Sequence, residues 1–382
     1  MKICTITCHR VYNYGASLQA FALQKFLENR GNEVEIIDYM PWYQQYRYNL
    51  FWLSKDEKSF KAKMMRAIPP LRFLLQPIRY LKAGIFTTWG RRSKFLKFEE
   101  DYLHITKRQY HNVEELRLVP PQAKVYIAGS DQIWNVALHN GWDPAHYLDF
   151  GEPSVFRMSY AASIGCNNIS EEAKSYMESF ITKLDAISIR EKTGVAIVRK
   201  LTDKPVSEVV DPVFLLPKET WISLIGKCSR ISSPERYLFL YDFLSKDDRI
   251  RKFTINVAKQ HNLKILSVND FHPCNYADIN INNAGPLEFL YYIFNSDYVI
   301  SNSFHATAFA IIMNKEFYSF SLTNQDNSSR MYDLLTGLGL LTRYNPKAED
   351  DNIVNWRDVS TLLDGRKEFS ANFLIQSLNS HV

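Results

Sequence analysis

Short runs of β-branched and aromatic residues alternate along the chain with stretches whose apolar residues recur at helical spacing. The runs predict buried strands, and the amphipathic stretches, such as 17–29 and 171–184, predict helices. Alternation of this kind is typical of an α/β fold, in which helices cover parallel sheets. The predicted strands are Ile3–Thr7, Val34–Asp38, Val125–Ala128, Arg157–Ala161, Ala186–Ile189, Ser207–Val210, Tyr237–Tyr241, Lys264–Val268, Tyr298–Ser301 and Phe317–Phe320.

The first predicted unit is a strand, a loop over 9–16, a helix over 17–30 and a second strand. The loop contains Asn13, Tyr14 and Gly15 and lies at the carboxyl end of a parallel strand, where open α/β sheets bind ligands. Backbone N–H groups at the start of the following helix suit an anion. The same loop also fits a tight strand-to-helix turn without a ligand, so both interpretations stay open.

The alternation breaks between residues 40 and about 115, where prolines interrupt aromatic, basic and aliphatic residues. This stretch predicts a helical insertion between the second and third strands. Because the chain has 382 residues, we expect two domains. We place the first over 1–205, the second over 206–350 with its sheet beginning near residue 211, and a C-terminal helix over 351–382 that packs back on the first domain.

The composition is that of an ordinary globular protein, with 46% hydrophobic and 23% charged residues. It excludes a disordered chain, a collagen and a coiled coil. The five cysteines form no CxxC pair, so they indicate neither a disulfide framework nor a zinc site, and we expect no bound metal. The start of the chain lacks a signal-peptide pattern and no run of 18 apolar residues occurs, so we expect a cytoplasmic protein.

The net charge of +5 is concentrated in one segment. Residues 55–97 hold twelve Lys and Arg against two acidic residues, a net charge of +10, so the rest of the chain carries −5. Nucleic acid is a poor fit as a partner, because the positive charge is confined to one segment and no motif of a nucleic-acid-binding module occurs.

Four polar clusters follow predicted strands, where side chains from different parallel strands meet at one edge of a sheet. In the first, 129–135, an acid and amides suit a sugar or a phosphate, although Asp131 also suits a helix N-cap. In the second, Arg190 suits a carboxylate or a phosphate. Arg190 equally suits an internal ion pair with Glu191 or Asp211.

The other two clusters follow strands in the second half of the chain. The third, 301–307, places His305 at the start of an apolar helix, where an imidazole protonates less readily and suits proton transfer. A lone His is more often structural, but the neighbouring hydroxyl residues favour a functional role here. The fourth, 323–330, is a polar loop that carries Arg330 and is either an anion ligand or a solvated loop.

Several common enzyme motifs are absent. The sequence has no GxGxxG, GxxxxGK[ST], HExxH or GxSxG pattern. Dinucleotide-dependent dehydrogenases, P-loop NTPases, zinc metalloproteases and α/β-hydrolases are therefore poor candidates.

Six motifs, in this order, resemble those of the polysaccharide pyruvyl transferase family. They are the stretch 7–24, AGSDQIWN at 128–135, SYAASIG at 159–165, SIREKTG at 188–194, VVDPVFLL at 209–216 and SNSFHATAFAI at 301–311. The resemblance implies two Rossmann-like domains in a GT-B-like glycosyltransferase architecture. It also implies transfer of a pyruvyl group from phosphoenolpyruvate to a sugar of a bacterial surface polysaccharide or its lipid-linked precursor, which forms a ketal.

The resemblance further implies roles for the clusters. Phosphoenolpyruvate carries a carboxylate and a phosphate, so Arg190 and Arg330 are the expected donor ligands, and no other cofactor is expected. His305 is the expected acid–base group, with Asp131 as a candidate for activating the acceptor. Ser303 and Asn302 are expected beside the donor, and Asn13, Tyr14, Gly15, Ser130, Gln132 and Asn135 beside the acceptor.

One motif departs from the family pattern. Some members carry an Arg two residues before the His, where this chain has Ser303. The missing cation is then expected from Arg190, Arg330 or Lys315. We expect Arg190, His305 and Arg330 to meet in one cleft between the domains.

The resemblance also gives the basic segment a context. It fits an anionic membrane at the inner face of the cytoplasmic membrane, the diphosphate of a polyprenyl-linked acceptor, or a basic cover over the acceptor site. Two other functions fit the same residues, a GT-B glycosyltransferase that uses a nucleotide-sugar and a non-catalytic scaffold of a polysaccharide-assembly complex.

Overall fold

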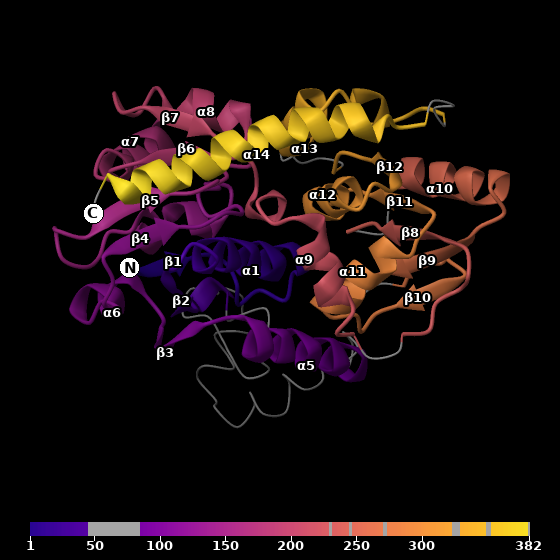
Figure 1. Ribbon diagram of the computed structural model, residues 1–382, viewed down its shortest axis with the longest axis horizontal. Helices are drawn as coiled ribbons and strands as arrows, with labels where there is room; N and C mark the ends of the chain where they lie inside the picture. The colour runs from indigo at the N-terminus through magenta and orange to yellow at the C-terminus, as the bar shows by residue number, and fades with distance from the viewer. Residues whose placement is uncertain are drawn as a thin grey trace, which may run out of the picture.

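The computed structural model describes residues 1–44, 85–228, 231–243, 247–269, 273–322, 329–348 and 353–380. In these residues the chain forms two five-stranded parallel sheets, each accompanied by helices (Figure 1). Both sheets have the strand order 3-2-1-4-5 when their strands are numbered along the chain, which is a doubly wound, Rossmann-like order. The predicted α/β fold with two Rossmann-like units is therefore confirmed.

The first sheet has the order β3-β2-β1-β4-β5 and the second the order β10-β9-β8-β11-β12. The strands are β1 (Lys2–Ile6), β2 (Glu33–Tyr39), β3 (Ile105–Tyr110), β4 (Val125–Ala128), β5 (Phe156–Ser159), β6 (Ile187–Ile189), β7 (Val206–Glu208), β8 (Tyr237–Tyr241), β9 (Lys264–Val268), β10 (Ile279–Ile281), β11 (Tyr298–Ser301) and β12 (Glu316–Ser319). The α-helices are α1 (Tyr14–Glu28), α5 (Ile85–Tyr102), α6 (Val113–Leu118), α7 (Glu171–Ile181), α8 (Lys192–Val198), α9 (Lys218–Ile225), α10 (Asp248–Gln260), α11 (Pro286–Phe294), α12 (Phe304–Ile312), α13 (Ser329–Gly337) and α14 (Trp356–Asn379).

All ten predicted strands are present, with ends that agree or differ by one or two residues. The inner strands β4 and β8 are buried along their whole length, as expected of parallel strands covered on both faces. Two strands at sheet edges were not predicted. β3 is mostly polar with an exposed centre, and β10 is only three residues long, so neither produces an apolar run.

The predicted boundary between residues 205 and 206 falls between β6 and β7. β7 follows that boundary but pairs in parallel with β6, and an isolated bridge from Ala162 to Ile189 connects β6 to the residues that follow β5. The second sheet begins at β8 rather than near residue 211. The apolar run of β7 identified a strand but carried no information about which sheet it joins.

The predicted helical insertion lies largely outside the described residues, and only its last part, α5, can be placed. Two of the basic residues of α5 are engaged within the protein. Arg91 is buried and donates to the carbonyl of Tyr12, and Lys94 pairs with Glu288 of α11 at 2.7 Å. Because Arg91 and Lys94 already contact other parts of the protein, these two residues do not support the predicted contact between the basic segment and a membrane.

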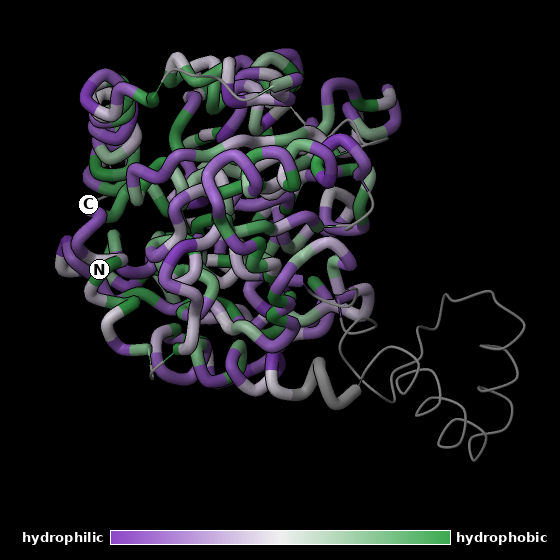
Figure 2. The backbone as a smooth tube through the Cα atoms, turned by 90° about the vertical axis from the view of Figure 1, so that its right-hand side faces the viewer, coloured by the Kyte–Doolittle hydropathy of each residue, from purple (hydrophilic) through white to green (hydrophobic). Residues whose placement is uncertain are grey.

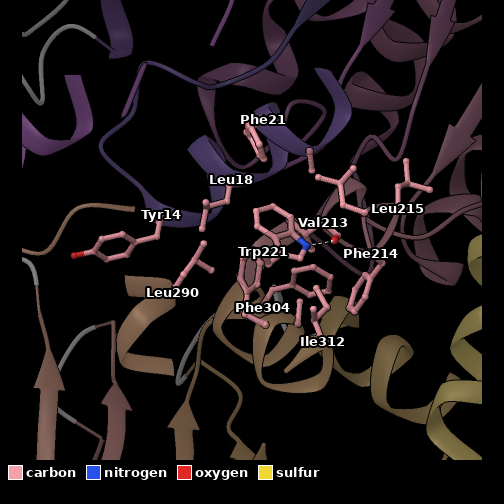
Figure 3. Close-up of a cluster of buried hydrophobic side chains, with 14 of the residues drawn as sticks. Tyr14, Leu18, Phe21, Val213, Phe214, Leu215, Trp221, Leu290, Phe304 and Ile312 are labelled. Carbon is pink, nitrogen blue, oxygen red and sulfur yellow. Dashed lines mark hydrogen bonds between the residues drawn. The ribbon is translucent and has the colours of Figure 1, made fainter. Parts of the chain in front are cut away.

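The two halves share a hydrophobic core with α1 at its centre. Every residue of α1 except Lys25 and Glu28 is buried, and a helix buried on all sides must pack against neighbours on all sides. One such neighbour is Trp221 of α9, whose ring meets Phe21 edge-on at 5.8 Å between centroids. Figure 3 shows Trp221 among the side chains of this core, with its indole N–H donating to the carbonyl of Val213.

The C-terminal helix α14 also connects the two halves, running from the second sheet back over the first (yellow in Figure 1). Arg366 of α14 pairs with Glu208 at 2.6 Å, and the hydroxyl of Ser370 accepts a hydrogen bond from the backbone N–H of Val210. Hydropathy along the backbone shows apolar segments running through the body of the protein (Figure 2). Within the described residues, no helix combines the length and apolar character needed to cross a bilayer.

Tyr14, which we predicted as an acceptor ligand, packs within the shared core instead. Its ring stacks on Phe289 of α11 with 4.3 Å between centroids and 6° between planes. Its hydroxyl donates to the carbonyl of Ala284, and the residue is only 1% exposed. Tyr14 therefore attaches α1 to the second half of the chain.

We expect Tyr14→Ala to lower the free energy of unfolding by about 3–5 kcal/mol, because it removes a large buried ring. Tyr14→Phe removes only the hydroxyl and costs about 1 kcal/mol. Urea denaturation measures both effects, with Phe369→Ala as the control, since that ring on α14 is 55% exposed. A cost for Tyr14→Ala no larger than that of Phe369→Ala contradicts the packing role.

Candidate active site

The carboxyl ends of the two sheets carry most of the predicted functional residues. In an open sheet of this order, ligands bind where the strand order reverses, which is between β1 and β4 and between β8 and β11. Ser130 and Asp131 follow β4, and His305 begins α12 directly after β11. Side chains from both reversal points meet between the two sheets, and one carboxylate connects them.

That carboxylate belongs to Asp211, in the segment between β7 and β8. Its Oδ2 accepts hydrogen bonds from the hydroxyl of Ser130 at 2.9 Å and from Nη1 of Arg190. Nε2 of His305 lies 3.4 Å from the same oxygen. The other oxygen, Oδ1, accepts from the backbone N–H of Val213, and the Asp211 side chain is fully buried. The ion pair between Arg190 and Asp211 that the sequence allowed is therefore present.

The charges around Asp211 decide its ionisation. Burial on its own raises the pKa of Asp211, but the adjacent positive charges of His305 and Arg190 outweigh this and hold it well below its usual range. Asp211 is therefore ionised at neutral pH. An ionised carboxylate beside an imidazole orients the ring.

Two guanidinium groups lie near one aromatic ring. The Cζ atoms of Arg190 and Arg330 are 4.4 Å and 5.9 Å from the ring centroid of Phe304. Arg190 Nη2 is 3.8 Å and Arg330 Nη1 3.9 Å from the same oxygen, Oδ1 of Asp131. The structure thus brings together His305, Asp131 and both arginines that the sequence predicted for this site.

These two guanidinium groups have unused donors although they are buried. The side chain of Arg190 is 2% exposed and that of Arg330 is 9% exposed. Nε and Nη2 of Arg190 and Nε of Arg330 donate no hydrogen bond within the described part of the chain. Burial, together with the neighbouring charge of Arg190, lowers the pKa of Arg330 to about 10. Buried cations with free N–H groups form a site for an anionic ligand.

His305 is held by a glycine of the other half. A Cβ atom at position 15 would overlap the imidazole ring, with Nδ1 as its nearest atom. Gly15 was predicted as an acceptor ligand, and the structure instead makes it the residue that leaves room for His305. Ser303 caps α12, its hydroxyl accepting from the backbone N–H of Ala306, and so fixes the helix that carries the imidazole.

The neighbouring loops are held by buried polar side chains. Oε1 of Glu191 accepts from the hydroxyl of Ser163 at 3.1 Å and from the backbone N–H groups of Ile164 and Gly165. The hydroxyl of Thr7 donates to the carbonyl of Ser130 at 3.0 Å. These contacts explain why polar residues occupy buried positions in the motifs at 159–165 and 188–194.

Asp131 does not cap a helix, which was the alternative interpretation of that residue. Its backbone is left-handed, with φ of +73°, and it forms a bridge to Ala162 rather than opening a helix. Lys315 is also absent from the site. It lies before β12, at the amino end of the strand, and donates to the carbonyl of Ser296. Arg190 and Arg330 are therefore the cations that stand near His305 in place of the Arg missing at Ser303.

Four other predicted ligands make contacts within the protein. Asn13 caps α1 through the backbone N–H of Ala16, which is why α1 begins three residues before its predicted start. Asn302 donates to Asp242 and accepts from the backbone N–H of Phe243. Gln132 and Asn135 bond each other at 2.6 Å. The rest of the cluster 323–330, apart from Ser329 and Arg330, lies outside the described residues.

Sequence reasoning missed two residues that build the site, Asp211 and Phe304. Asp211 was noted only as a possible ion-pair partner, and Phe304 only as part of a motif. The signal for both was their place in the ordered motifs at 209–216 and 301–311. Neither residue has a local pattern that identifies its partners.

Substitution of Gly15 tests whether this residue packs against His305. In an open helical position, Gly→Ala stabilises a protein by up to about 1 kcal/mol, which we expect for Gly365→Ala in α14, where no atom lies near the added Cβ. We expect Gly15→Ala to be destabilising instead, because the new methyl group overlaps the imidazole. In the His305→Ala background, Gly15→Ala becomes neutral or stabilising. Urea denaturation of the single and double variants measures this, and an unchanged cost in the His305→Ala background contradicts the contact.

Comparison with known proteins agrees with this architecture. A solved UDP-GlcNAc 2-epimerase of Methanocaldococcus jannaschii, in complex with UDP-GlcNAc and UDP, is 11% identical, covers 100% of both chains and has a TM-score of 0.52. A Listeria monocytogenes protein assigned as a UDP-N-acetylglucosamine 2-epimerase is 10% identical, covers 98% of this chain and 90% of its own, and has a TM-score of 0.50. At such identities the likeness shows the fold alone, which is GT-B-like.

Sequence comparison identifies the family. No curated protein matches the chain. The family model of the polysaccharide pyruvyl transferases matches residues 13–324, which include Asp131, Arg190, Asp211 and His305. The chain therefore belongs to the polysaccharide pyruvyl transferase family.

Proposed function

We propose that the protein transfers the pyruvyl group of phosphoenolpyruvate to a sugar of a bacterial surface polysaccharide or its lipid-linked precursor, forming a pyruvate ketal. One observation carries this proposal. Two buried arginines with free N–H groups lie beside a His–Asp pair at the carboxyl ends of two sheets. This combination provides both anion binding and proton transfer in a single site.

Phosphoenolpyruvate fits the two arginines because it carries two anionic groups. A carboxylate and a phosphate each accept the paired N–H groups of a guanidinium. Arg330 lies next to Arg190, and the mutual repulsion of the two cations is relieved when an anion binds between them. Asp211 pairs with only one nitrogen of Arg190, Nη1, which leaves Nε and Nη2 for the ligand.

The chemistry that we propose needs one group that gives and takes protons. Protonated His305 donates a proton to the methylene carbon of phosphoenolpyruvate, which creates an electron-poor C2. A sugar hydroxyl attacks C2 and loses its proton to His305 or Asp131. A second hydroxyl then displaces phosphate at C2 and closes the ketal, its proton leaving with inorganic phosphate. The products are one ketal and one phosphate, and Asp211 stabilises the imidazolium that the first step requires.

The direct test is mass spectrometry of a polyprenyl-diphosphate-linked oligosaccharide incubated with the protein and phosphoenolpyruvate. The proposal predicts addition of pyruvate with loss of water, together with release of inorganic phosphate. Parallel incubations contain UDP- or GDP-sugars in place of phosphoenolpyruvate. Transfer of a glycosyl group in those incubations, with none of a pyruvyl group, contradicts the proposal and supports a glycosyltransferase.

Replacing Arg330 and replacing Arg190 are expected to change the stability of the protein in opposite directions. We expect Arg330→Met to raise the melting temperature of the ligand-free protein, because it removes a buried cation that has no carboxylate within hydrogen-bond distance among the described residues. We expect Arg190→Met to lower the free energy of unfolding by about 3–5 kcal/mol, because it leaves buried Asp211 without its cation.

Both arginine variants lose donor affinity in this proposal. Loss of one charged hydrogen-bond donor corresponds to about a 10- to 100-fold weaker Kd for phosphoenolpyruvate. Calorimetric titration measures the Kd and differential scanning fluorimetry the melting temperature. An Arg330→Met protein that binds phosphoenolpyruvate as tightly as the wild type contradicts the role of Arg330.

His305→Ala separates proton transfer from binding. We expect kcat to fall by about 10²–10⁴-fold, the usual contribution of a positioned proton donor. The Kd for phosphoenolpyruvate changes little, because the cations that hold it lie on other residues. If His305→Ala instead abolishes donor binding but retains single-turnover chemistry, His305 is a phosphate ligand and the proton-transfer role passes to Asp131.

A further inference from the structure

A group of three aromatic side chains lies near the carboxyl end of β2, outside the arginine site. The rings of Trp42 and Tyr43 both contact His139, at 5.0 Å and 5.5 Å between centroids. Tyr43 and His139 are nearly parallel, with 26° between their planes. His139 is exposed, and Trp42 and Tyr43 are half-buried. We call these three residues the aromatic platform.

Hydrogen bonds to Asp143 hold part of the platform in place. Oδ2 of Asp143 accepts hydrogen bonds from the hydroxyls of Tyr43 at 2.8 Å and Tyr39 at 2.6 Å. Oδ1 of Asp143 accepts from the backbone N–H of Ala145, which fixes the loop that follows His139. A platform anchored in this way presents its rings without losing conformational entropy when a ligand binds.

Buried polar atoms without partners lie next to the platform. Gln44, which follows Tyr43, donates its amide N–H to Sγ of Cys8, while its Oε1 is buried and accepts no hydrogen bond within the described residues. Nε2 of His9, the next residue after Cys8, is likewise buried and unpartnered in the described structure. Buried polar atoms of this kind are satisfied by water or by a ligand.

The platform connects to the proposed active site through one short chain of contacts. Asn140, the neighbour of His139, donates to the carbonyl of Gln132 and to Sγ of Cys8. Gln132 follows Asp131, whose carboxylate lies beside Arg190 and Arg330. The segment 131–140 therefore links the platform to the arginine site, both of which lie near the carboxyl ends of strands of the first sheet.

Among the described residues, the charges near the platform favour a neutral ligand. Arg10, the cation next to His9, is already paired with Asp38 and Glu99. A phosphate or diphosphate would need a free cation here, whereas the apolar face of a pyranose ring packs on aromatic rings and its hydroxyls satisfy adjacent polar atoms.

We propose that the aromatic platform binds a neutral pyranose residue of the acceptor glycan, with Gln44 Oε1 accepting from one of its hydroxyls. This inference rests on the proposed function, because it assigns the acceptor side of that reaction. It also replaces the acceptor ligands that we predicted from the sequence, most of which hold the protein together. Bound there, a glycan extends past Asp131 toward the donor arginines.

Saturation-transfer-difference NMR tests this site without requiring turnover. The probes are the methyl β-pyranosides of galactose, glucose and mannose, each mixed with the full-length protein. We expect saturation transfer to the ring C–H protons of at least one probe, and a loss of most of that signal in His139→Ala and in Trp42→Ala. Phe369→Ala, which removes an exposed ring from α14, is the matched control and keeps the wild-type signal.

Two outcomes overturn the inference. One is the absence of saturation transfer from the wild type to any of the three probes, and the other is a signal unchanged in both platform variants. Trp42 is half-buried, so unfolding of Trp42→Ala is checked by circular dichroism, and the exposed His139 decides the result if that variant fails to fold. Phosphoenolpyruvate binding is measured on the same samples. If the wild type does not bind phosphoenolpyruvate, the proposed function is contradicted. If it binds phosphoenolpyruvate but the platform variants leave the pyranoside signal unchanged, only the acceptor site is contradicted.

Discussion

The buried carboxylate of Asp211 is the interaction on which the arrangement of the two halves depends. One oxygen atom accepts from Ser130 and Arg190 of the first half and lies 3.4 Å from His305 of the second. A fully buried carboxylate is tolerated only when cations and hydrogen-bond donors surround it. The sheets must therefore be placed so that these groups, which are far apart in the sequence, reach a single atom.

The same placement creates the features that suit catalysis. Because His305 packs directly on Gly15, the position of the imidazole is set by the contact between the two halves rather than by α12 alone. Arg330 is different, because its burial beside Arg190 is unfavourable without a ligand, as its lowered pKa reflects. Residues at functional sites commonly lower the stability of the folded protein. The site thus combines the buried ion pair of Arg190 and Asp211 with a second buried cation, Arg330, which lies 3.9 Å from Asp131.

Much of the fold follows from apolar runs in the sequence. The inner strands of both sheets are rich in β-branched, aromatic and leucine residues, so their positions were predictable to within one or two residues. The edge strands β3 and β10 were not, because an edge strand is half-solvated and needs no apolar run. The pairing of β7 with β6 depends on contacts between segments that are separated in the sequence, which an apolar run alone does not specify.

The residues that meet in the candidate site were predictable where topology decides their positions. Arg190, His305 and Asp131 each follow a parallel strand, and parallel strands bring their carboxyl ends to one edge. The roles of Tyr14, Asn135 and Asn302 were not predictable, because an aromatic or amide side chain in a loop fits a ligand and a protein neighbour equally well. Only the packing partner decides, as the stacking of Tyr14 on Phe289 shows.

A crystal structure of the protein soaked with phosphoenolpyruvate would show directly whether the two arginines bind the donor. We expect electron density for the ligand beside Phe304, with its carboxylate and phosphate oxygens within hydrogen-bond distance of Arg190 Nε or Nη2 and Arg330 Nε, and its methylene carbon facing His305. Density for phosphoenolpyruvate elsewhere on the protein, with both guanidinium groups still unliganded, would contradict the account.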